Sequence, residues 1–111
     1  MSIQWQGVFP AVTTKLKPDF SLDLDAIRQG LERLIANGVG GVVMMGMVGE
    51  NAQLAPDEKL AVLRTAVETV RGRVPVVSGV AETGTARAAA FAQEAARIGV
   101  DGLMAVSYTH L

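Results

Sequence analysis

The sequence contains no cysteine, which excludes disulfide bonds, cysteine redox chemistry and zinc sites built from thiolates. An excess of charge of one sign is also missing, because 10 lysine and arginine residues face 11 aspartate and glutamate residues. With a formal net charge of −1, the chain has no general attraction to a phosphate backbone or an anionic membrane surface. We therefore expect no nucleic acid and no membrane among its partners.

Long hydrophobic runs are absent as well. The longest weakly polar run covers residues 39–49, whereas a membrane-spanning helix needs about 20 residues. The opening residues, Met-Ser-Ile-Gln-Trp, contain neither the basic nor the apolar part of a secretory signal. Half of the residues are nevertheless hydrophobic, which is enough for one domain with its own core. We expect a cytoplasmic protein.

Four short apolar segments have the composition of buried parallel strands, because both of their faces are apolar. They cover residues 8–13, 41–46, 75–80 and 102–106. An internal repeat supports this assignment: Gly-Val-x-Gly followed by four apolar residues occurs at 38–45 and again at 99–106. The offset of 61 residues corresponds to two strand–helix units of about 30 residues each.

Three helices are predicted between these strands. The first follows Asp23, a favourable N-cap, and the second begins at Pro56, which suits a first helical position. The third covers residues 85–98 and ends at Gly99. The second helix is expected to bury an apolar stripe of Leu60, Leu63, Val67 and Val70.

Alternating strands and helices predict an α/β fold with a parallel sheet and right-handed crossovers. Four strands and three helices correspond to the N-terminal half of a (β/α)8 TIM barrel, and a small open sheet is the alternative. In the barrel the strands stand in the order 1-2-3-4 with helices on one face only. We expect the interior face to carry Val42, Met44, Leu103 and either Val76 or Val77.

The loop that follows the second predicted strand is the most informative segment. In both architectures ligands bind at the carboxyl ends of the strands. Gly46 and Gly49 flank Met47 and Val48, so the backbone can turn sharply and direct the N–H groups of Met47, Val48 and Gly49 at an anion such as a carboxylate. The alternative is a plain strand-to-helix turn. The Gly-Lys-Ser/Thr of a phosphate-binding P-loop does not follow.

Few side chains in this sequence suit acid–base or nucleophilic chemistry. Glu50 and Glu82 each act either as a general base or, the more common arrangement, as an acceptor of hydrogen bonds that fixes a loop. The only lysines are Lys15, Lys17 and Lys59, and none lies on a predicted strand, where burial would favour a nucleophilic amine. We expect no cofactor and no metal site.

Five segments, in order, resemble successive blocks of the dihydrodipicolinate synthase/N-acetylneuraminate lyase family. They cover residues 7–14, 20–25, 46–51, 75–80 and 99–106. The resemblance, over about residues 5–106, implies a (β/α)8 barrel that is usually a homotetramer. It also implies a Schiff base between a strand-borne lysine and a 2-oxo acid, commonly pyruvate. The family's Gly-Thr-Thr-Gly-Glu loop, which holds the substrate carboxylate, is matched here by Gly46 to Glu50.

The sequence departs from the family pattern at three places. Met47 and Val48 stand where the family has two threonines, so the hydroxyl groups are missing while the backbone N–H groups remain. Thr14 stands where the family has proline. Residues 107–111 do not match the family's Pro-Tyr-Tyr, and no tyrosine role is assigned to Tyr108. The Schiff-base lysine is expected beyond residue 111.

We therefore expect residues 1–106 to be the N-terminal half of a TIM-barrel domain, and residues 107–111 to be a non-native tail. The predicted function is that of a fragment of a class I aldolase or lyase, similar to 4-hydroxy-tetrahydrodipicolinate synthase and inactive on its own. Its predicted substrate-binding residues are Gly46, Met47, Val48, Gly49 and Glu50. Two alternatives stay open: a non-catalytic anion-binding α/β module, and a half-barrel that self-associates through its open sheet edges.

Overall fold

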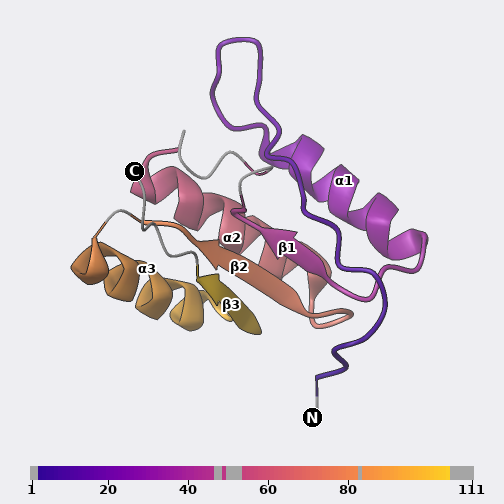
Figure 1. The fold of residues 1–111 in the computed structure, drawn as a ribbon. Coiled ribbons are helices and arrows are strands. Elements are labelled where there is room, and N and C mark those ends of the chain that lie inside the picture. The colour runs from indigo at the N-terminus through magenta and orange to yellow at the C-terminus, as the bar shows by residue number, and fades with distance from the viewer. Residues whose placement is uncertain (1–2, 47–48, 50–53, 83, 106–111) are drawn as a thin grey trace.

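The structure is a computed structural model that describes residues 3–46, 49, 54–82 and 84–105 (Figure 1). Within these residues helices and strands alternate along the chain. The elements are α1 (Leu24–Ala36), β1 (Val42–Met44), α2 (Pro56–Val70), β2 (Val76–Val80), α3 (Thr85–Ile98) and β3 (Gly102–Ala105). The three strands form one parallel sheet in the order β1-β2-β3.

The first predicted strand, residues 8–13, is not a full strand. It contributes a single parallel bridge, between Ala11 and Val43. Val12 N–H donates to the Val43 carbonyl at 2.9 Å, and Val43 N–H donates to the Pro10 carbonyl at 3.0 Å. Pro10 has no N–H group and cannot donate to a sheet ladder, which explains why the pairing stays short. The sheet therefore has three strands instead of four, although this segment still lies beside β1, as the predicted order requires.

The helix boundaries follow the local signals in the sequence. A carboxylate oxygen of Asp23 accepts the N–H of Ala26 at 3.0 Å and caps α1. At the start of α2, the N–H of Ala55 donates to the Glu58 carboxylate at 2.9 Å. The third helix, α3, ends at Gly99, whose φ of 110° lies in the left-handed region that glycine adopts without strain.

All three helices contribute to one hydrophobic core. The second helix, α2, contacts α1, α3, β1 and β2. It passes behind β1 and β2 in the view of Figure 1, with α1 and α3 on either side of it. Its buried apolar residues are Val62, Leu63, Ala66 and Val70. Of the predicted stripe, Leu63 and Val70 are buried, while Leu60 and Val67 are partly buried and pack against the core.

The prediction of which strand residues face the barrel interior was wrong for Val42, Met44 and Leu103, whereas Val77, one of two alternatives at its position, does lie on the face away from the helices. Val42 and Met44 are buried, and the register places them opposite Val76 and Ser78 on the face that the helices cover. Leu103 lies opposite Ser78 and therefore belongs to the same face. Side chains alternate between the two faces of a strand, so the other face carries Val43, Val77 and Met104. Because the strands are apolar on both faces, their sequence gave no alternation from which to assign the faces.

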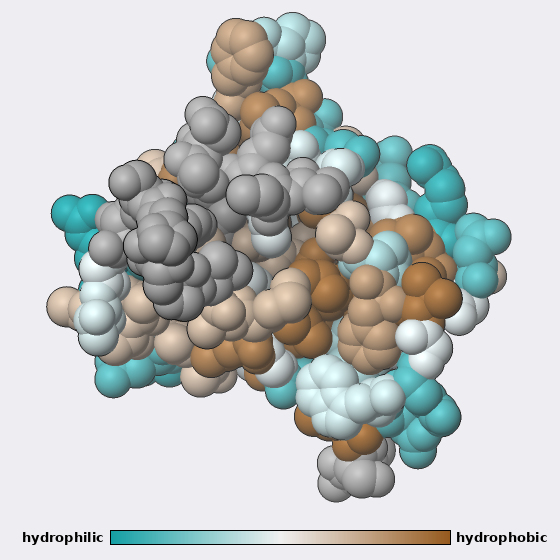
Figure 2. Space-filling view, in the orientation of Figure 1, coloured by the Kyte–Doolittle hydropathy of each residue, from teal (hydrophilic) through white to brown (hydrophobic). Residues whose placement is uncertain are grey.

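Two aromatic rings of the N-terminal segment lie against glycines of the sheet region. Trp5 and Phe9 stack with ring centroids 6.0 Å apart. A Cβ atom added at Gly41 would lie 2.3 Å from the Phe9 ring, and one added at Gly102 would lie 3.0 Å from the Trp5 ring. Figure 2 shows apolar side chains gathered over the middle of this side of the molecule, with hydrophilic ones towards its edges.

Candidate functional site

The backbone directly after β1 forms a turn that is tied to a distant segment. The N–H of Gly49 donates to the carbonyl of Gly46 at 3.1 Å, which closes the turn. The hydroxyl of Thr14 donates to the carbonyl of Gly49 at 2.5 Å, and Thr14 is buried. The turn at the carboxyl end of β1 is therefore held by the segment that runs alongside β1.

A glycine on β2 allows the end of β1 to approach closely. A Cβ atom added at Gly79 would lie only 2.3 Å from the carbonyl oxygen of Met45, a distance that side chains do not tolerate. Gly49 is confined in the same way, since an added Cβ would lie 3.1 Å from the carbonyl oxygen of Val12. Both glycines are needed because backbone approaches backbone here.

The predicted anion cradle is changed by this geometry. The sequence predicted that the N–H groups of Met47, Val48 and Gly49 converge on a carboxylate. The Gly49 N–H donates to the Gly46 carbonyl within the turn, so it is already used there, and the substrate-binding role predicted for Gly46 and Gly49 stays a prediction. Met47, Val48 and Glu50 lie outside the described residues, and their part in the cradle stays a prediction.

Thr14 is a site residue that the sequence analysis did not identify. From the sequence, Thr14 was recognised only as a residue at the carboxyl end of the first predicted strand, at a position where the family has proline. Its partner, Gly49, is 35 residues away in the sequence. No local pattern reports such a contact, and the one available signal was a hydroxyl group at the end of a predicted strand.

The second polar feature near the carboxyl ends of the strands is an ion pair. The Nζ of Lys59 lies 2.7 Å from Oε1 of Glu82, and the two side chains are 6% and 18% exposed. The same Nζ lies 5.8 Å from the centroid of the Phe91 ring, within the range of a cation–π contact. Of the two roles considered for Glu82, the structure favours the acceptor that fixes a loop, with a lysine as the donor.

The burial of Lys59 was not predicted, although the spacing of α2 contains a signal for it. Lys59 stands three and four residues before Val62 and Leu63, which are buried, and so shares their helix face. From the sequence, Lys59 was assigned only to a position that is not on a strand, and its place on the buried face of α2 was not considered.

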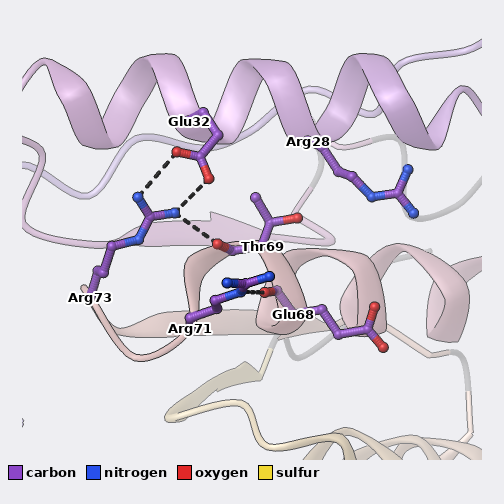
Figure 3. A pocket seen from close by; sticks show the side chains of 6 residues that line it. All are labelled: Arg28, Glu32, Glu68, Thr69, Arg71 and Arg73. Carbon is purple, nitrogen blue, oxygen red and sulfur yellow. Dashed lines mark hydrogen bonds and ion pairs between the residues drawn. The ribbon is translucent and has the colours of Figure 1, made fainter.

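A groove lies between α1 and α2 (Figure 3). Its volume is about 760 Å³, and its lining residues are Arg28, Glu32, Glu68, Thr69, Arg71 and Arg73. The guanidinium of Arg73 donates to both carboxylate oxygens of Glu32, at 2.6 and 3.1 Å, and to the Thr69 carbonyl at 2.7 Å. Arg73 precedes β2, so this groove is at the amino end of that strand, away from the predicted site.

No three His, Cys, Asp or Glu side chains in the part of the chain that the structure describes gather into a group able to hold a metal ion. None of the described helices has the length and apolar character needed to cross a membrane.

Known proteins resemble this chain in sequence. Residues 4–109 match the dihydrodipicolinate synthetase family. The chain is 41% identical over 102 residues to the 4-hydroxy-tetrahydrodipicolinate synthase of Methanococcus maripaludis strain C5. It is 42% identical over 101 residues to the enzyme of that name from Xanthomonas axonopodis pv. citri strain 306. These matches cover 92% and 91% of this chain but 35% and 33% of the relatives, so the chain spans about a third of their length.

Solved structures give the same result for the fold. The 4-hydroxy-tetrahydrodipicolinate synthase of Methylacidiphilum fumariolicum SolV superimposes with a TM-score of 0.90 at 31% identity, over 97% of this chain and 36% of that one. YagE, a prophage protein of the dihydrodipicolinic acid synthase family from E. coli K12 solved in complex with pyruvate, gives 0.89 at 30% identity, over 96% and 37%. The parallel strands and helices thus correspond to part of a TIM barrel, and the chain belongs to the dihydrodipicolinate synthetase family.

Proposed function

We propose that this chain is the N-terminal part of a class I aldolase or lyase that forms a Schiff base with pyruvate or a related 2-oxo acid. The observation that carries the proposal is the family match over residues 4–109, which includes the glycine-flanked turn after β1. A relative solved with pyruvate supports the class of substrate. The whole protein would act in the manner of a 4-hydroxy-tetrahydrodipicolinate synthase, and we propose a homotetramer.

The proposed reaction begins at a lysine beyond residue 111. Its amine adds to the ketone carbon of the 2-oxo acid, and loss of water gives the Schiff base. Removal of a proton from the neighbouring carbon gives an enamine, which forms or breaks a carbon–carbon bond. The covalent step therefore lies outside this chain, and we expect the chain alone to be inactive.

The proposed contribution of this chain is to bind the substrate carboxylate. Two backbone N–H groups, those of Met47 and Val48, are the donors that we assign to it, because the Gly49 N–H is used within the turn. Backbone donors hold an anion without a charged side chain. Since neither residue has a hydroxyl group, the proton transfers that the family's threonines would relay need another group or a water molecule.

Thr14 and Gly79 support this site without contacting the substrate. The Thr14 hydroxyl holds the Gly49 carbonyl on one side of the turn, while Gly79 leaves room for the Met45 carbonyl on the other. A donor pair fixed before the substrate arrives loses little entropy on binding.

We also propose that residues 1–106 form the N-terminal half of the barrel and that residues 107–111 are a non-native tail.

Reduction with borohydride in the presence of pyruvate tests this proposal. The extended protein, by which we mean this chain continued to the full length of its relatives, is expected to gain one pyruvyl group per subunit in its intact mass. Peptide mapping should place that group on a lysine beyond residue 111. The chain of 111 residues, treated in parallel, should gain none. An adduct on Lys15, Lys17 or Lys59, or none on the extended protein, would contradict the proposal.

A further inference from the structure

The segment that leads into α1 folds back on itself as a hairpin, which projects from the body of the molecule (Figure 1). It covers residues 15–22, and its two arms meet in an antiparallel bridge between Leu16 and Leu22. Near its tip lies Phe20, whose side chain is 80% exposed, more than any other large hydrophobic side chain among the described residues. Single exposed apolar side chains are common, but the backbone that carries this one is unusual.

Phe20 has a backbone conformation that suits glycine. Its φ is 70°, in the left-handed region, which bulky residues rarely adopt because their side chains crowd the backbone there. The N–H of Phe20 donates to the carbonyl of Lys17 at 2.8 Å and closes a four-residue turn. Glycine is favoured at the last position of the commonest turn of this length. The sequence therefore has an exposed phenylalanine where glycine would form the hairpin with less strain.

Hydrogen bonds hold the tip in this conformation. The N–H of Lys17 donates to the carbonyl of Ser21 at 2.8 Å. A carboxylate oxygen of Asp19 accepts both the N–H and the hydroxyl group of Ser21, at 3.0 and 2.6 Å. The Phe20 side chain is thus carried by a fixed support, and a contact made from such a support costs little conformational entropy.

We propose that Phe20 docks on the part of the polypeptide that follows residue 111 in the whole protein. This chain covers only 35% of its relative from Methanococcus maripaludis strain C5, so a long continuation is available to cover the ring. The inference rests on the proposed function, because it takes this chain to be the N-terminal part of such a protein.

The closure of the barrel brings that continuation to the hairpin. The hairpin leaves the carboxyl end of residues 8–13, which lie beside β1 through the bridge between Ala11 and Val43. In a closed barrel the last strand pairs with the first, since no edge is left open. The later part of the chain therefore returns to the side of the sheet from which the hairpin projects.

Phe20→Gly in the extended protein tests this docking by its melting temperature. If the ring is buried against the later part of the chain, the loss of its apolar contacts outweighs the relief of backbone strain. We then expect the melting temperature to fall by about 4 °C or more. If the ring has no partner, glycine relieves strain and removes no contact, so the melting temperature stays unchanged or rises. That result would overturn the inference.

Arg71→Gly is the matched control. Arg71 is also exposed and also has a positive φ, 53°, at the end of α2. The change removes only an exposed hydrogen bond of 3.3 Å to the carbonyl of Glu68, and glycine is favoured at such a helix end. We expect an unchanged or higher melting temperature. An equal fall in both variants would show that glycine itself is the cause and would overturn the inference.

Phe20→Leu serves if Phe20→Gly does not fold. Leucine keeps an apolar side chain of smaller size, so the melting temperature should fall by less, and an unchanged value would overturn the inference. Light scattering identifies the partner of the ring. Phe20→Gly should keep the molar mass of the unmodified extended protein, whereas a smaller species would show that Phe20 contacts a second copy, and the proposed docking would be wrong.

Borohydride trapping with pyruvate separates this inference from the proposed function. If pyruvate is trapped on the extended protein but Phe20→Gly does not lower the melting temperature, only the docking fails. If the melting temperature falls but no pyruvate is trapped, the proposed function fails and the docking stands.

Discussion

The hydroxyl of Thr14 donates a hydrogen bond of 2.5 Å to the carbonyl of Gly49, across 35 residues of sequence. Both residues are buried, so water cannot replace the donor if it is removed. A buried carbonyl left without its donor costs about 1–3 kcal/mol. This contact thus affects both the stability of the fold and the position of the proposed site.

Thr14→Val keeps the shape of the side chain and removes the hydroxyl group. We expect the free energy of unfolding in urea to fall by about 1–3 kcal/mol, and KM for pyruvate in the extended protein to rise. Thr13→Val is the control, because Thr13 is exposed and its hydroxyl only accepts a hydrogen bond from the Lys15 side chain. Equal losses in the two variants would show that the Thr14–Gly49 bond is unimportant.

Gly79→Ala tests the close approach of β1 to β2. The new Cβ would lie 2.3 Å from the Met45 carbonyl oxygen, so the strands must shift, and we expect the free energy of unfolding to fall by about 1–3 kcal/mol or more.

Gly30→Ala should change the free energy of unfolding in the opposite direction. Gly30 lies within α1 with open space around its Cα, and alanine there should stabilise the protein by about 0.5–1 kcal/mol. Urea unfolding of both variants decides, and a neutral Gly79→Ala would contradict the expected contact.

Glu32→Gln tests the pH dependence of the contact between α1 and Arg73. The hydrogen bond from Arg73 lowers the pKa of the Glu32 carboxyl below its ordinary value of 4.5. A carboxyl with a lowered pKa stabilises the folded state above its unfolded pKa, and that contribution is lost as the pH falls through the folded pKa.

The melting temperature of Glu32→Gln should therefore lie below that of the unmodified protein at pH values above about 5, and the difference should shrink as the solution is acidified below about pH 4. Thermal unfolding followed by circular dichroism between these limits measures it. Parallel pH profiles for the two proteins would show that the Arg73 contact does not depend on the Glu32 charge.

Met104→Lys tests self-association through the exposed edge. Within the described residues β3 pairs only with β2, and its Leu103 and Met104 are 46% and 48% exposed. An unpaired apolar strand edge favours association with another copy. We expect the chain of 111 residues to form large particles in light scattering, and Met104→Lys to reduce them. Phe20→Lys, at a residue that is 80% exposed but lies off the sheet, should have little effect; a monodisperse unmodified chain would refute this expectation.

Local signals allowed much of the fold to be predicted from sequence. The bounds of α3 agree with the prediction at both ends, and α1 and α2 begin directly after Asp23 and at Pro56 as expected. Each of these boundaries depends on residues within one helical turn, such as a capping oxygen, a proline or a glycine. The order of the strands in the sheet was also predictable, because successive strand–helix units in such folds lie side by side.

The features that were missed depend on contacts between distant residues. The Lys59–Glu82 pair spans 23 residues, and the Thr14–Gly49 bond spans 35. The assignment of Val42 and Met44 to the wrong face has another cause: a strand that is apolar throughout contains no alternation to report which side faces the helices. Part of the candidate site was predictable only as a glycine spacing, and the use of the Gly49 N–H within the turn needed the structure.

Trp5 is the only tryptophan of the chain, and its ring lies against the backbone at Gly102, almost at the other end of the described sequence. Its indole therefore serves as a built-in optical probe. Fluorescence from this single tryptophan reports whether β3 has docked onto the rest of the sheet. Quenching by iodide, followed during refolding, would time the arrival of the last described strand without any label attached to the protein.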